Sequence, residues 1–230
     1  MNRGDEHAHH YFDIDTNRAG YLFARDQWDN ERASWFVFTT RHDDANHTHY
    51  DMNSFLFTAF GEQFATHENV FPYMDQHHVA NIEHNIIIVG EGGMPANDRP
   101  NSAGDDGSLL GFMTGAATGN FADYARGDAR ASDADRSIPG SLPSVRAEPS
   151  VLFVKQGPTP YIVIADDMQR SGDEQDYHWQ WYTRAKTVTG TGTSSEPFLS
   201  AGEQANCRLA FHTPASPEHD QTSSVYCAPT

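Results

Sequence analysis

The stretch that decides the fold is HTHYDMNSF at residues 47–55, which leads into the apolar run FLFTAF at residues 55–60. Side chains two residues apart on a β-strand point to the same face. His47, His49 and Asp51 would therefore form one polar row. The row enters a strand that is apolar on both faces, as expected in the middle of a sandwich. A row of this kind can bind a metal ion, transfer protons, or do both.

Short runs of aromatic and β-branched residues, separated by turn residues, continue this pattern along the chain. We find no convincing amphipathic helix of useful length. The sequence therefore predicts an all-β fold, an antiparallel β-sandwich of many short strands. We expect strands at residues 20–26, 34–40, 54–60, 63–67, 84–90, 119–125, 151–154, 161–165, 177–182 and 209–212.

Composition and charge exclude several classes of partner. The chain has 230 residues, 37% of them hydrophobic, and a formal net charge of -17. Such a charge repels nucleic acid and anionic membranes, so we expect neither as a partner. No apolar run approaches the roughly 18 residues of a membrane helix. The polar N-terminus shows no signal peptide, yet we expect a secreted or periplasmic protein whose natural start lies elsewhere.

Two residue types leave alternatives open. The chain has only two lysines, which suits either a salt-adapted organism or an ordinary acidic secreted protein. It also has two cysteines, Cys207 and Cys227. They would form either one disulfide near the C-terminus or two free thiols.

Histidines recur at the ends of the expected strands. If the hairpin after residue 54 folds back on itself, His67 returns close to the HTHYD row, and His84 opens the next strand. Imidazoles from three neighbouring strands are a plausible zinc site. The alternative is that these are ordinary surface or packed histidines, because the chain has 13.

These motifs together resemble the C-terminal β-sandwich of heparinase II/III-type polysaccharide lyases. The resemblance rests on H-x-H-x-D-x-x-S-F at residues 47–55, the Gly-Glu turn at 61–62, and His84-Asn85 before an apolar strand. It covers residues 18–215, which leaves an N-terminal extension at 1–17 and a C-terminal tail at 216–230. Members of this family cleave uronic-acid polysaccharides such as alginate, heparan sulfate or ulvan by β-elimination.

The resemblance implies a role for each residue of the row. His47 would be the catalytic histidine, which shares the proton transfers with a tyrosine. His49 and His84 would be zinc ligands, and Asp51 would orient His49. Zinc would hold the strands in register beside the cleft rather than activate water.

The sequence departs from the family at two places. The middle zinc ligand is usually an aspartate, whereas here the position is His67, with Glu68 beside it as the alternative. The family also has a helical (α/α) toroid that supplies further site residues, and this chain has none. Tyr73 is the best local candidate for the catalytic tyrosine; the alternative is a surface aromatic in a loop.

Three functions compete for this pattern. The first is a polysaccharide lyase, or its catalytic half, with an acidic polysaccharide as substrate and with a helical toroid or a second copy of the chain as partner. The second is a zinc-stabilised module that binds carbohydrate or another domain, where Trp179 and Trp181 would stack on sugars unless they belong to the core. The third is a cupin-like metalloenzyme. Asn53 and Ser54 argue against the cupin, because they replace the glutamate expected about four residues after His-x-His.

Overall fold

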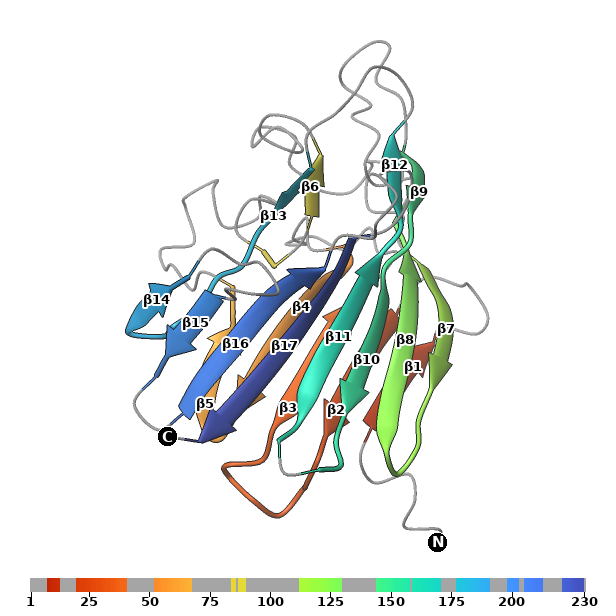
Figure 1. Cartoon of the computed structure of the whole chain (residues 1–230). Coiled ribbons are helices and arrows are strands. Elements are labelled where there is room, and N and C mark those ends of the chain that lie inside the picture. Colours follow the sequence, from red (N-terminus) through yellow and green to blue (C-terminus); the bar gives the residue numbers. More distant parts are fainter. Residues whose placement is uncertain are drawn as a thin grey trace, which may run out of the picture.

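The computed structural model describes residues 8–12, 20–40, 52–67, 84–85, 87–89, 112–129, 144–157, 159–170, 177–190, 198–202, 205–212 and 221–229. Strands in these ranges form two large antiparallel sheets, which face each other in Figure 1. Within the described ranges there is no helix, and thus none long and apolar enough to cross a membrane. The predicted all-β sandwich is therefore confirmed.

The first sheet has five strands in sequence order. They are β1 (Ala8–Phe12), β2 (Gly20–Arg25), β3 (Trp35–Thr39), β4 (Ser54–Ala59) and β5 (Glu62–Ala65). The order means that each strand pairs with the next along the chain, as in a meander.

The second sheet has eight strands and is not sequential. Its spatial order is β14 (Thr187–Thr189), β15 (Phe198–Ala201), β16 (Ala205–His212), β17 (Gln221–Pro229), β11 (Tyr161–Asp166), β10 (Ser150–Val154), β8 (Ala122–Asp128) and β7 (Phe112–Ala117). Two short ribbons stand at the upper end of Figure 1. They pair β6 (Ile87–Val89) with β13 (Tyr177–Trp179), and β9 (Ser144–Ala147) with β12 (Met168–Arg170).

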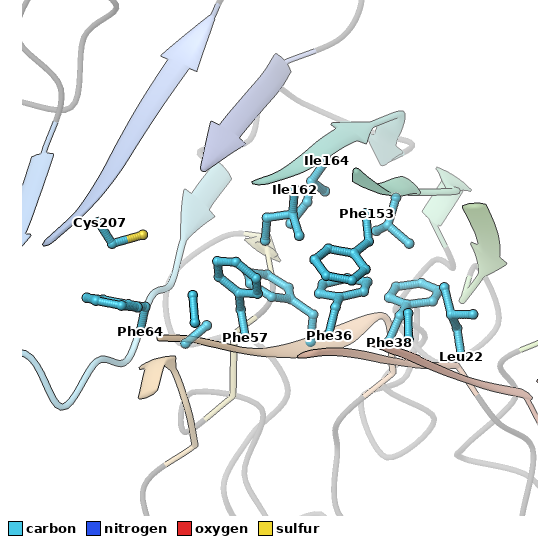
Figure 2. Packing of buried hydrophobic residues seen from close by; sticks show 14 of the residues in the cluster. Leu22, Phe36, Phe38, Phe57, Phe64, Phe153, Ile162, Ile164 and Cys207 are labelled. Carbon is cyan, nitrogen blue, oxygen red and sulfur yellow. The ribbon is translucent and has the colours of Figure 1, made fainter. Parts of the chain in front are cut away.

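The core lies between the two large sheets and is dominated by phenylalanine (Figure 2). Phe153 of β10 meets two rings of the opposite sheet, with centroids 6.1 Å from Phe36 and 6.2 Å from Phe57. All three side chains are fully buried. Aromatic pairs at this separation add to the stabilisation that comes from burying apolar area. Aromatic side chains of β3, β4 and β10 thus face inward and meet between the sheets.

Glycine is required where the edges of the two sheets come together. A Cβ at Gly20 of β2 would lie 2.5 Å from the Thr40 carbonyl oxygen and 2.7 Å from Met113 Cβ of β7. Any side chain there would push the strands apart. Gly20 therefore permits the close approach that closes this side of the sandwich.

The hairpin after β4 turns one residue earlier than expected. The turn is at Phe60 and Gly61, which have φ values of 56° and 85°, and β5 begins at Glu62. Two residues with positive φ suit the tight turn that joins twisted antiparallel strands. The Phe60 conformation is the feature that the sequence did not indicate.

Some strands differ from expectation. The single strand expected at 119–125 is a hairpin of β7 and β8 with its turn at 118–121. β17 lies inside the segment expected to be a tail, yet it pairs with β11 and β16 within the sheet. β1 likewise adds a strand from within the expected extension.

The cysteines are bonded rather than free. Cys207 forms a disulfide, and the described part of the chain contains no free thiol. The other cysteine of the chain, Cys227, is its direct partner across the β16–β17 pair. The bond therefore links the last two strands of the chain.

Candidate functional site

Two of the five residues that we predicted for the site lie in the described part of the chain, and they lie together. The ring centroids of His67 and His84 are 6.0 Å apart, with an angle of 60° between the ring planes. His84 is buried and His67 is half-buried. Two of the three imidazoles that we expected to converge therefore lie side by side, whereas the expected return of His67 to the HTHYD row falls outside the described residues. His47, His49 and Tyr73, like Asp51 and Glu68, lie outside the described residues.

The two rings lie near, but not at, the separation of a shared zinc site. Two imidazoles bound tetrahedrally to one zinc, each with a Zn–N bond of about 2.0–2.1 Å, place their ring centroids about 5 Å apart. The centroids of His67 and His84 are 6.0 Å apart, so the rings would move closer to share an ion. Within the described ranges, no group of three or more His, Cys, Asp or Glu side chains gathers around a common point. A complete zinc site would therefore need a ligand from elsewhere in the chain, where His49 was predicted.

Asn85 fixes the backbone around both histidines. It is almost fully buried, and its Nδ2 donates to the Phe55 carbonyl at 2.9 Å and to the Thr66 carbonyl at 2.8 Å. Its Oδ1 accepts from the Tyr182 N–H at 2.7 Å. The Thr66 N–H in turn donates to the Tyr182 carbonyl at 2.9 Å. One amide therefore joins three chain segments beside the histidine pair.

Asn53, which precedes β4, is also held in place by contacts. Asn53, just before β4, has a φ of 60°, and its Nδ2 donates to the Ala147 carbonyl of β9 at 3.1 Å. Its side chain packs directly over Gly127 of β8, where an added Cβ would overlap the Asn53 oxygen. Asparagine tolerates the left-handed conformation better than most residues. This contact fixes the backbone at the start of β4.

Two tryptophans form the wall between the site and the core. Trp179 and Trp181 stack on each other at 5.5 Å, and both pack against Phe55. Trp181 Nε1 donates to the Phe64 carbonyl at 2.7 Å. The core interpretation of these tryptophans is supported, because both are partly buried and pack against the hydrophobic core.

A buried carboxyl group accompanies this wall. Asp166, at the end of β11, accepts a hydrogen bond from Trp179 Nε1 at 3.2 Å. Burial raises the pKa of Asp166 to about 7, and the Trp179 hydrogen bond only partly opposes the rise. The carboxyl group therefore titrates near neutral pH within the tryptophan wall.

Sequence reasoning missed the roles of Asn85 and Asp166. Asn85 was part of the His-Asn motif, but nothing in the motif indicates which backbone groups its amide binds. Asp166 directly follows the strand expected at residues 161–165, and that position alone does not indicate burial. A polar residue directly beside an apolar run was the available signal in both cases.

Comparison by sequence finds no relative: no protein-family model matches the chain, and no curated protein does. Comparison by structure does find similar proteins. A mutant of heparan sulfate lyase HepC from Pedobacter heparinus has a TM-score of 0.65 and 15% identity over 93% of this chain. The HepC enzyme itself gives 0.63 and 14%, also over 93%.

A second protein gives the same result. A heparinase III with methylated lysines has a TM-score of 0.63 and 12% identity over 98% of this chain. The chain spans only about a third of the length of these proteins, namely 33% of HepC and 34% of the heparinase III. The resemblance seen in the sequence is thus confirmed at the level of the fold: this chain has the β-sandwich fold of heparan sulfate lyases of the heparinase III type, over a third of their length.

Proposed function

We propose that this chain is the β-sandwich part of a polysaccharide lyase that cleaves uronic-acid polysaccharide by β-elimination. The observation that carries the proposal is the fold: at least 93% of the chain superimposes on heparan sulfate lyases. The paired rings of His67 and His84 support it, because they occupy two of the positions that the family resemblance assigns to zinc.

The reaction requires three actions on the substrate. The uronate carboxylate must be neutralised, a base must remove the proton at C5, and an acid must protonate the glycosidic oxygen as it leaves C4. The electron pair of the broken C5–H bond then forms the C4–C5 double bond. We assign the proton transfers to His47 and Tyr73, following the family resemblance.

The zinc proposal concerns His49, His67 and His84. These residues would present their neutral imidazoles as ligands from fixed positions. Zinc, when bound, would keep the strands in register beside the cleft. His67 follows the β5 hairpin and His84 precedes β6, so a shared ion would join these two elements. Metal binding of this kind adds to folding free energy.

The remaining parts of the proposal are a partner and a compartment. The chain spans a third of the lyases it resembles, so a helical toroid domain or a second copy of the chain would complete the cleft. A net charge of -17 opposes an acidic substrate, so the partner would supply positive charge at the cleft. The disulfide at Cys207 supports an oxidising, extracytoplasmic location.

The test combines metal content with activity. The purified chain is analysed for zinc by mass spectrometry and assayed for unsaturated uronate by absorbance on heparan sulfate, alginate and ulvan. We expect one zinc per chain and formation of unsaturated product. If the chain alone is inactive, the assay is repeated with a toroid-containing partner. Zinc without product in either assay would favour a non-catalytic carbohydrate-binding or domain-pairing module. If the purified chain contains no zinc, the proposed three-histidine site is wrong.

Matched histidine variants separate the proposed roles. His49→Ala and His84→Ala should lose zinc and lower the melting temperature. His47→Ala should retain zinc and lose activity. Loss of zinc from His47→Ala alone would contradict this division of roles.

A further inference from the structure

The amide of Asn85 can be oriented in only one way. Its nitrogen faces two carbonyl oxygens, those of Phe55 and Thr66, and its oxygen faces the N–H of Tyr182. A flipped amide would place its oxygen against two acceptors and its nitrogen against a donor. The contacts therefore use both N–H groups and the carbonyl of the side chain, at 1% exposure.

The three contacts join segments that are far apart in the sequence. Phe55 belongs to β4, Thr66 follows β5, and Tyr182 follows β13. They lie 30, 19 and 97 residues from Asn85. Each contact satisfies a backbone group at or near the protein interior, where an unpaired group would be costly.

The two histidines are the sequence neighbours of this network. His84 directly precedes Asn85, and His67 directly follows Thr66, whose carbonyl Asn85 binds at 2.8 Å. The amide thus fixes the backbone on both sides of the gap between the rings. The ring centroids of these two histidines are 6.0 Å apart.

We propose that Asn85 is a positioning residue that holds the rings of His67 and His84 side by side. The link to zinc rests on the function proposed above, whereas the link to ring position does not. Outer partners that orient metal ligands typically change metal affinity by about 10–100-fold when they are lost. Asn85 would act in the same way, although it binds the neighbouring backbone rather than the imidazoles.

The experiment uses Asn85→Asp, which keeps the size of the side chain and the acceptor for Tyr182 N–H but loses both donors. In the metal-free protein, we expect the nuclear Overhauser contact between the His67 and His84 ring protons to be lost. In a zinc titration, we expect the dissociation constant to rise about 10–100-fold. If Asn85→Asp does not fold, Asn85→Ser, which retains one hydroxyl donor, is measured in the same way.

A control separates positioning from loss of stability. Ile162→Val truncates a fully buried side chain between the sheets (Figure 2), and we expect it to lower the melting temperature while keeping the ring contact and the zinc affinity. Unchanged ring contact and affinity in the Asn85 variant would overturn the proposal, as would equal losses in the control. If the parent protein binds no zinc, the zinc proposal fails, and the ring contact alone decides the role of Asn85.

Discussion

At the end of the sandwich where β6 pairs with β13 (Figure 1), the buried polar groups include the Asn85 amide, the His84 imidazole and the Asp166 carboxyl group, whereas near the β7–β8 turn they include a lysine and an aspartate. Asn85 binds backbone groups of three distant segments. Lys155 instead binds Asp123 at 2.9 Å, with side-chain exposures of 3% and 0%, and so links β8 to the residue that follows β10.

The comparison shows two different reasons for burying polar groups. A buried ion pair can often be replaced by apolar residues without loss, because desolvation of both charges offsets their attraction. The Asn85 amide cannot be replaced in this way, because its partners are backbone groups that no substitution removes. We therefore expect stability to fall when one partner of the Lys155–Asp123 ion pair is removed, and to recover when both are replaced by apolar residues. Replacement of Asn85 should instead affect the candidate site itself.

The largest expected effect is at the ion-pair end. Lys155→Met would leave the Asp123 charge buried and uncompensated, so we expect the free energy of unfolding to fall by about 3–5 kcal/mol in urea denaturation. Adding Asp123→Leu should restore most of the loss, and zinc affinity should not change. A double variant as unstable as the single one would contradict this reading of the pair.

The next effect belongs to the histidine end and depends on pH. Burial raises the pKa of Asp166 from its ordinary value of 3.8 to about 7, so the folded state keeps this proton between about pH 4 and pH 7, where the unfolded chain loses it. The resulting stability is fully present below pH 4 and is lost as pH rises to 7. A rise from 3.8 to about 7 corresponds to about 4 kcal/mol.

Asp166→Asn tests this dependence, because it keeps an acceptor for Trp179 Nε1 but cannot titrate. We expect the difference in unfolding free energy between parent and variant to change by about 4 kcal/mol across that window. Urea denaturation at several pH values measures it. A difference that is constant with pH would show that Asp166 does not hold the proton.

A covalent link gives the next effect. Reduction of the disulfide at Cys207, or Cys207→Ser, would release a loop of about 20 residues, and we expect a loss of about 3 kcal/mol. Cys207 lies on β16, whereas His67 and His84 lie next to other strands, so we expect the two regions to be independent. Thermal unfolding with and without reductant measures the loss, and a change in zinc affinity on reduction would contradict the independence of the two regions.

The smallest effect sharpens the comparison at the histidine end. Trp181→Phe would remove the hydrogen bond to the Phe64 carbonyl, at a cost of about 1 kcal/mol. Phe121→Leu, at a side chain that is 60% exposed, should change stability by less than about 0.5 kcal/mol. Equal effects of the two variants in urea denaturation would mean that the tryptophan wall contributes little.

Local pattern was sufficient for much of the fold. Short runs of aromatic and β-branched residues predicted β2, β3, β4, β10 and β11, because such side chains pack well on the buried face of a strand. His67 and His84 were expected to converge from the ends of strands, and the structure places their ring centroids 6.0 Å apart. β17 was missed because its sequence, QTSSVYCAP, opens with four polar residues, and its place is set by pairing with β11 and β16.

By itself, the sequence determined the class of fold and two residues that the structure brings together at the site. Only the tertiary structure decided what holds them there. The partners of Asn85 are the carbonyls of Phe55 and Thr66 and the N–H of Tyr182, groups that every non-proline residue carries. The identity of a side chain therefore gives no sign of such a contact. It exists because three segments from distant parts of the chain meet at one corner.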